Sequence, residues 1–278
     1  MIDKKSILLQ TKKKLFSTLT GEHNSIFSGS GLEFKQLRQY TTNDDIRHIN
    51  WKKTSKSLEP SVNIFEESRQ LDIVLVYLNS GSLYFGTKKS KKTTASEILI
   101  SLSEAVVLNK DLLTSIFFSK DVDIFYKATK DKSIVDINLE TINNIKTLKN
   151  EIDYNSLTNY LLHKIKKKSL IFLIGDFLDF DENSFLSKVS YKHEIYCAIV
   201  RDKMEENLSM LGEFDFIDTN TNISKSISLD KNSIKKYNKA MKEYDDSLFK
   251  YLNNSKIKYQ KIYTHLNSVD GVKALVKK

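Results

Sequence analysis

Short apolar runs alternate with helix-like spacing of apolar residues from position 71 to the end of the chain. Mostly apolar runs predict buried strands at 73–78, 114–118, 170–174 and 195–200, with a more mixed candidate at 259–263. Apolar residues recur at helical spacing over 94–109, 156–167, 233–253 and 268–276, which predicts amphipathic helices. This alternation favours the α/β class, with a mostly parallel sheet covered by helices on both faces.

Three segments depart from this alternation. Residues 121–126 follow a strand so closely that we expect them to pair antiparallel with it at an edge of the sheet. Residues 214–218 and 223–229 flank the turn-like stretch TNTN and predict a hairpin. Residues 2–19 interleave apolar positions with lysines up to Gly21, which predicts a basic amphipathic helix. Such a helix packs against its own domain or rests on an anionic membrane surface.

The length of 278 residues suits two domains, or one α/β domain with an extension. We divide the chain into residues 1–70, which hold the predicted N-terminal helix and an irregular or β-rich segment, and residues 71–278, the α/β domain. The chain is basic, with 44 Lys and Arg against 35 Asp and Glu. Its lysines are spread along the sequence, which indicates a solvated surface; a nucleic-acid-binding module stays an alternative.

The single cysteine, Cys197, lies in the apolar run EIYCAIV, which favours a buried structural thiol over a nucleophile. The sequence shows neither the apolar core of a secretory signal nor a run of about 20 apolar residues that could span a bilayer. We therefore expect a cytoplasmic protein, with peripheral attachment at the inner face of the membrane as an alternative.

Two loops that follow predicted strands carry oxygen-bearing side chains. Ser80 and Ser82 follow the strand at 73–78, and Asp176 follows the strand at 170–174. In open α/β sheets, ligands bind beyond the carboxyl ends of the strands, and a hard cation prefers carboxylate and hydroxyl oxygens. The alternative is that the two serines cap a turn and Asp176 caps a following helix.

The stretch SGSGLEFKQLRQYTTNDDIRHINW at 28–51 combines alternating acids and bases with the only tryptophan of the chain. Pairing of His48 with an aspartate suggests acid–base chemistry, but no nucleophile accompanies it in the sequence. We favour a salt-bridged surface that serves recognition, with Trp51 anchoring the segment to the sheet. The residues of this predicted interaction segment are Glu33, Arg38, Asp44, Asp45, Arg47, His48 and Trp51.

This stretch resembles the signature of domain-of-unknown-function family 58, a pattern close to G-S-G-x-E-F-x-x-x-R-x-Y-x-x-G-D-D-x-R-x-I-D-W. The chain departs from it at Asn43, where the pattern has Gly, and at Asn50, where it has Asp. The segment RDKMEENL at 201–208 extends the resemblance more loosely. The resemblance implies a von Willebrand factor A-like domain preceded by a family-specific segment.

Members of this family often keep a metal-ion-dependent adhesion site, D-x-S-x-S with a threonine and a second aspartate. The resemblance places Ser80, Ser82 and Asp176 on three of its positions. Leu78 falls on the first aspartate and Asn155 near the threonine, so the site is expected to be degenerate. Without that carboxylate Mg²⁺ loses its main anionic ligand, and we expect no cofactor.

The resemblance also implies a function. Family members occur beside MoxR-type AAA+ ATPases and membrane-anchored von Willebrand factor A proteins. The chain is therefore expected to be a non-enzymatic adaptor or co-chaperone in complex assembly or stress tolerance. The alternative from another class is a metal-dependent enzyme that uses Asp176 and the loop serines; cation-dependent turnover would favour it.

Overall fold

The computed structural model describes residues 31–41, 44–57, 59–68, 70–217 and 224–277. These residues belong to two compact units, one ending at Leu71 and one beginning at Asp72, and each is described by itself. The helix predicted at 2–19, with Gly21, and the signature position Asn43 lie outside the described residues.

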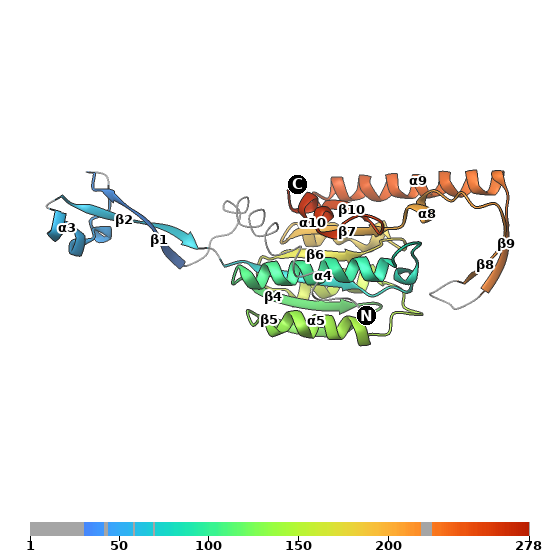
Figure 1. Ribbon diagram of the computed structural model, residues 1–278, viewed down its shortest axis with the longest axis horizontal. Helices are drawn as coiled ribbons and strands as arrows, with labels where there is room; N and C mark the ends of the chain where they lie inside the picture. The colour runs from blue at the N-terminus through green and yellow to red at the C-terminus, as the bar shows by residue number, and fades with distance from the viewer. Residues whose placement is uncertain (1–30, 42–43, 58, 69, 218–223, 278) are drawn as a thin grey trace. The chain divides into compact units, whose positions relative to one another are not determined.

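The unit that begins at Asp72 is built on a six-stranded sheet in the order β10-β7-β6-β3-β4-β5 (Figure 1). Neighbouring strands pair in parallel except β5, which pairs antiparallel with β4 at one edge. The prediction of an α/β fold with a mostly parallel sheet is confirmed. The strands are β3 (Asp72–Leu78), β4 (Leu112–Phe118), β5 (Val122–Thr129), β6 (Leu170–Gly175), β7 (Glu194–Arg201) and β10 (Lys258–Tyr263).

Helices cover both faces of this sheet. On one face α4 contacts strands β3, β4, β6 and β7, and it packs beside α5 and α10. On the other face α6, α7 and α9 supply side chains to one apolar cluster with the strands. The helices are α4 (Lys91–Leu108), α5 (Ser133–Asn144), α6 (Tyr154–Lys164), α7 (Leu186–Ser190), α8 (Lys203–Glu206), α9 (Lys231–Asn254) and α10 (Ser268–Val276).

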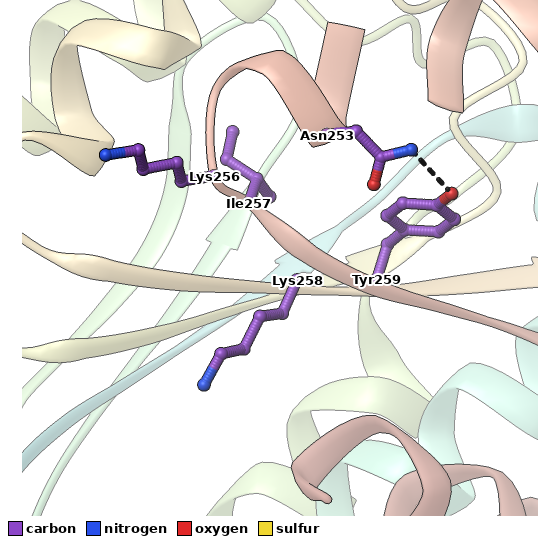
Figure 2. Close-up of a pocket in the computed structure, with 5 residues that line it drawn as sticks. All are labelled: Asn253, Lys256, Ile257, Lys258 and Tyr259. Carbon is purple, nitrogen blue, oxygen red and sulfur yellow. Dashed lines mark hydrogen bonds between the residues drawn. The ribbon is translucent and has the colours of Figure 1, made fainter. Parts of the chain in front are cut away.

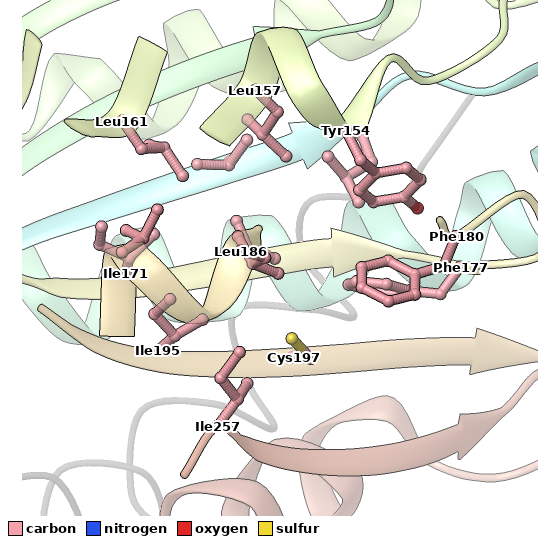
Figure 3. Close-up of a cluster of buried hydrophobic side chains, with 14 of the residues drawn as sticks. Tyr154, Leu157, Leu161, Ile171, Phe177, Phe180, Leu186, Ile195, Cys197 and Ile257 are labelled. Atoms are coloured by element: carbon pink, nitrogen blue, oxygen red, sulfur yellow. The ribbon is translucent and has the colours of Figure 1, made fainter. Parts of the chain in front are cut away.

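The apolar cluster explains why the central strands are hydrophobic along their whole length. Alternate residues of β3, such as Val74, Val76 and Leu78, face the α6–α7–α9 side. The residues between them are also buried, because α4 covers the opposite face. Figure 3 shows Leu157, Leu186 and other members of the cluster packed around the strands. Cys197 lies in this cluster as a free, buried thiol, in agreement with the expected structural role.

The strand order creates a switch point between β3 and β6. The chain runs from β3 outward to β4 and β5, returns to β6 on the other side of β3, and continues outward to β7 and β10. Loops beyond the carboxyl ends of β3 and β6 therefore diverge and leave room for a site between them. Ser80, Ser82 and Asp176 belong to these two loops.

A hairpin of β8 (Gly212–Ile217) and β9 (Ser224–Leu229) confirms the antiparallel pair predicted around TNTN. Helix α5 was not predicted, because its sequence SIVDINLETINN is rich in β-branched residues and lacks a clear apolar stripe. Within the described residues, no helix combines the length and the apolar character needed to cross a membrane.

The unit that ends at Leu71 pairs β1 (Gly31–Gln39) antiparallel with β2 (Ser61–Ser68). Between these strands lie a short 3-10 helix, η1 (Ile46–His48), and helix α3 (Trp51–Ser57), so the segment is β-rich with a helical insertion. Trp51 is 65% exposed, so the described residues of this unit do not bury its indole, and its anchoring to the sheet of the other unit stays a prediction. Among the described side chains of this unit Val62 is the buried apolar one, so the indole has no apolar layer to enter.

Candidate functional site

A chain of hydrogen bonds joins the two loops at the switch point. The hydroxyl oxygens of Ser80 and Ser82 lie 2.7 Å apart, and Ser82 Oγ donates to Asp176 Oδ2 at 2.5 Å. Ser80 also caps the 3-10 helix η2 (Gly81–Tyr84), accepting the backbone N–H of Ser82. Asp176 caps no helix among the described residues; the following helix, η3 (Glu182–Ser184), is capped by Asp181. The structure therefore brings together the three polar side chains singled out at the strand ends.

A lysine ammonium group occupies the centre of this cluster. Lys91 Nζ donates to Asp176 Oδ2 at 2.8 Å and to Glu205 Oε1 at 2.6 Å. The Lys91 side chain is fully buried, and those of Asp176 and Glu205 are only 5% and 11% exposed. We call Asp176, Lys91 and Glu205 the switch-point triad.

Local structure fixes the position of the ammonium. Ser90 caps α4 by accepting the N–H of Thr93, which makes Lys91 the first helical residue. The backbone N–H of Lys91 donates to Phe85 O at 2.8 Å, and its ammonium lies 5.9 Å from the centre of the Phe85 ring. Glu205 reaches the same point from α8. The triad thus ties the loop after β6 to the starts of two helices.

The two carboxyl groups of the triad respond differently to burial. Burial raises the pKa of Asp176, but the positive charge of Lys91 and the hydrogen bonds from Lys91 and Ser82 outweigh it, so this pKa lies below its usual value. For Glu205 burial is the stronger effect and raises the pKa despite the attraction of Lys91. The folded state therefore favours ionisation of Asp176 and opposes that of Glu205.

The other positions of the adhesion-site pattern lie outside the triad. Leu78 is buried in the apolar cluster, so close to Gly175 that a Cβ there would lie 2.8 Å from Leu78 Cβ. Asn79 turns the other way and donates to Asp123 Oδ2 and Lys146 O at 3.1 and 2.9 Å. Asn155 is exposed in the first turn of α6, where its backbone N–H donates to Asp153.

These residues do not fit a magnesium ion of the adhesion-site type. Mg²⁺ needs several oxygen ligands, including one or two carboxylates. Leu78 supplies no ligand, and the Asp176 oxygen that accepts from Ser82 also holds an ammonium. A divalent cation at this point would meet a fixed positive charge. Throughout the described residues, no three His, Cys, Asp or Glu side chains are grouped so that they could hold a metal ion.

A second charged cluster lies at the carboxyl end of β7, which is the end of the sheet that also carries the triad. The fully buried Arg201 donates to Asp245 Oδ1 at 3.0 Å, and Lys261 bridges Asp245 and Glu206. Next to it, Asp202 accepts the backbone N–H of Thr87 at 3.0 Å and the Thr264 hydroxyl at 2.6 Å. These bonds hold the loop between η2 and α4 against the loop after β10.

The acids and bases of the interaction segment pair locally. Arg38 donates to Asp44 Oδ1 at 2.6 Å, and Asp44 also accepts the backbone and hydroxyl groups of Thr41. Hydrogen bonds from the Thr41 backbone and side chain, with Arg38, lower the pKa of Asp44. Asp45 caps η1 and forms a bidentate pair with Arg47, which lowers the pKa of Asp45.

Two further positions of this segment have defined backbone roles. Asn50 Oδ1 accepts the N–H of Lys53 at 3.0 Å, so this asparagine serves as a cap at the start of α3, as the Asp of the pattern could. His48 ends η1 and donates its backbone N–H to Asp45 O. Glu33 lies on β1 opposite Glu66 of β2, and its side chain is outside the described structure.

Neither of two surface pockets is lined by the residues of the triad. One of about 290 Å³ is lined by Asn253, Lys256, Ile257, Lys258 and Tyr259 (Figure 2). It sits where β10 begins, at the amino end of the sheet, and Asn253 Nδ2 donates to Tyr259 Oη across it. Its lining holds no nucleophile paired with a base, so it does not suggest a catalytic site.

The family profile described as "Protein of unknown function DUF58" matches residues 36–246, about three quarters of the chain. The chain belongs to the DUF58 family. Uncharacterized proteins of Mycobacterium bovis and Mycobacterium tuberculosis are each 34% identical to it over 88 residues, which are 32% of this chain. That match spans only 28% of the length of these curated relatives.

Solved structures similar to this DUF58 protein include two from Bacteroides. The conserved hypothetical protein BatB of Bacteroides thetaiotaomicron is 12% identical, with a TM-score of 0.46, and the match covers 74% of this chain and 97% of that one. An aerotolerance-related membrane protein of Bacteroides fragilis is also 12% identical, with a TM-score of 0.45 and coverages of 74% and 96%.

Partial signals for the residues that complete the site are present in the sequence. Glu205 lies in the segment RDKMEENL, which marks it as part of a family-like stretch without revealing its contact. Lys91 lies in the run KKSKK, where one buried lysine cannot be told from its solvated neighbours by composition. Its position directly after a capping serine is the one local hint that it begins a helix.

Proposed function

We propose that this DUF58 protein is a non-enzymatic protein-interaction module. Its role would be that of an adaptor for a MoxR-type AAA+ ATPase and membrane-anchored von Willebrand factor A proteins in complex assembly or stress tolerance. The class of partner comes from the resemblance of residues 28–51 to the family signature. The proposed location is the cytoplasm, with peripheral attachment to the inner face of the membrane as the alternative.

The observation that carries this proposal is the exposure of the interaction segment. Ile46 and Trp51 are 63% and 65% exposed, and the Arg47 side chain is 86% exposed. Tryptophan and arginine are the residue types most enriched at binding hot spots, and a stable fold does not need them on its surface. Asp45 holds the Arg47 guanidinium in place, which reduces the entropy lost when a partner binds.

The switch-point triad supports an interaction that needs no metal. In the adhesion-site pattern a divalent cation organises the loops at the ends of the strands. Here the ammonium of Lys91 holds the loop after β6 and α8 together from within the chain. The cation is thus covalently part of the protein, and partner binding should not depend on the concentration of divalent ions.

Binding of the purified full chain to a MoxR-type ATPase from the same genome tests the proposal. Biolayer interferometry with the nucleotide-free ATPase should show binding that Arg47→Ala and Trp51→Ala each weaken at least tenfold. Both side chains are exposed, so both variants should stay folded. Lys239→Ala, which removes an exposed base from α9, is the matched control and should bind normally.

The same assay in EDTA and in Mg²⁺ should give equal affinities. If both variants bind as tightly as the native chain, the interface lies outside the interaction segment. Loss of binding in EDTA would contradict an interaction that needs no metal. Turnover that requires a divalent cation would instead favour the enzyme. A steep salt dependence of DNA or RNA affinity would favour the nucleic-acid-binding module.

A further inference from the structure

Exposed aromatic and basic side chains gather next to the switch point, on the unit that begins at Asp72. Tyr84 and Phe85 follow the loop serines, and they are 44% and 39% exposed. Leu148, 50% exposed, lies in the loop after α5. Large apolar groups left in water on a charged surface often mark an interaction site. With three lysines they form what we call the basic–aromatic patch, namely Tyr84, Phe85, Lys88, Lys92, Lys146 and Leu148.

Hydrogen bonds hold the two loops of this patch side by side. Gly81 N donates to Asn150 O at 2.8 Å, and the Asn79 side chain donates to Lys146 O at 2.9 Å. Lys92 spans the loops, with its ammonium 3.5 Å from Ile145 O and 5.3 Å from the centre of the Tyr84 ring. The patch is therefore a fixed surface made by segments far apart in the sequence.

The lysines of the patch carry charge that the described residues leave unneutralised. Lys89, their neighbour in sequence, pairs with Glu97, whereas Lys88, Lys92 and Lys146 have no carboxylate partner within the described part of the chain. Partial burial lowers the pKa of Lys92. The nearby Asp123 is engaged by Asn79 and Ser119. A carboxylate of a binding partner could form an ion pair with Lys92.

We propose that the basic–aromatic patch docks an acidic protein segment that also carries apolar side chains. Its acids would pair with Lys88, Lys92 and Lys146, and its apolar residues would cover Tyr84, Phe85 and Leu148. This goes beyond the proposed function, because the surface is distinct from the interaction segment and its binding can be measured without the ATPase.

A protein segment fits the patch better than a nucleic acid strand does. Single-stranded nucleic acid binds by stacking bases on free aromatic faces along a basic groove. Here Lys92 lies over one face of the Tyr84 ring and Lys91 over one face of the Phe85 ring. Leu148 offers no aromatic ring on which a base could stack, and the patch contains no arginine.

Fluorescence anisotropy with the full chain tests the inference. The probe is a labelled 12-residue peptide of alternating acidic (Asp, Glu) and apolar (Leu, Phe) residues, with a matched peptide carrying Lys for every acid and a labelled oligothymidylate as controls. The acidic peptide should bind, and the basic one should not. Lys88→Glu combined with Lys146→Glu should weaken binding at least tenfold, and Leu148→Ser should weaken it several-fold. Lys239→Glu on α9 should leave it unchanged.

All substituted side chains are exposed, and urea unfolding of each variant checks that the fold is kept. Four results would overturn the inference: no binding of the acidic peptide, equal binding of the basic peptide, tighter binding of the oligothymidylate, or binding unaffected by the double charge reversal. Loss of ATPase binding in Arg47→Ala, with peptide binding intact, would show that the two surfaces act separately.

Discussion

Replacing Lys91 by methionine should reveal how strongly the switch-point triad holds the fold. Methionine keeps an unbranched side chain of similar length, so most of the packing remains while the ammonium is lost. Asp176 and Glu205 would then face each other in a buried site without a cation. We expect the free energy of unfolding at pH 7.5 to fall by about 3–5 kcal/mol, the range found when one partner of a buried ion pair is removed.

The geometry supports a loss of this size. The ammonium lies 2.8 and 2.6 Å from the two carboxylate oxygens, and with an effective dielectric constant of about 20 each contact contributes roughly 6 kcal/mol of attraction. Desolvation of the three buried charges offsets much of this, so the net stabilisation by the intact triad is smaller. The loss in the variant comes mainly from carboxylates left buried without a counter-charge.

Urea unfolding at two pH values separates this effect from a packing defect. Without Lys91 the pKa of each carboxyl group in the folded variant should rise above its unfolded value. Such a group stabilises the fold at low pH and loses that contribution as pH rises through the folded pKa. The deficit relative to the native chain should therefore be larger at pH 7.5 than at pH 5. Adding Asp176→Asn and Glu205→Gln to Lys91→Met should recover most of it. A deficit below about 1 kcal/mol, or one independent of pH, would refute the reasoning.

Three further results are expected. Trp51→Ala should change the free energy of unfolding by less than about 1 kcal/mol, because the indole is exposed; a loss of several kcal/mol would show that it is packed. Burial lowers the pKa of His193 to about 4, so between pH 6.5 and 4 the imidazole is protonated in the unfolded chain but stays mostly neutral in the folded one. Stability present above pH 6.5 should decline by up to about 3 kcal/mol as pH falls towards 4, and His193→Leu should flatten this decline in urea titrations. Burial also raises the pKa of Cys197, so Ellman's reagent should label this thiol only after unfolding; rapid labelling of the native chain would contradict its burial.

The sequence predicted the sheet well because its central strands are buried on both faces. Runs such as IVLVYL and LIFLIG have no polar alternation, and helical spacing separates them. The antiparallel edge strand β5 was also predictable, since too few residues separate it from β4 for a crossover. Sequence periodicity could not place Trp51, because a tryptophan beside charged residues fits an anchor and an exposed recognition residue equally well.

The candidate site was predictable only in part. The topology of parallel strands brings Ser80, Ser82 and Asp176 to one place. Their positions directly after two predicted strands, and on the adhesion-site pattern, indicated this. The triad could not be predicted, because Lys91 and Glu205 come from helix starts that are remote from Asp176 in sequence. Their pairing depends on how α4 and α8 pack on the sheet, and no local pattern encodes that contact.

A calorimetric titration of divalent cations tests the central claim most directly, that an ammonium group of the chain itself takes the place of a metal ion at the switch point. Mg²⁺ and Mn²⁺ at millimolar concentration are titrated into the full chain and into Asp176→Ala. We expect no saturable heat from the native chain, because Lys91 already neutralises Asp176 and Leu78 supplies no ligand. Saturable binding by the native chain that disappears in Asp176→Ala would contradict the claim.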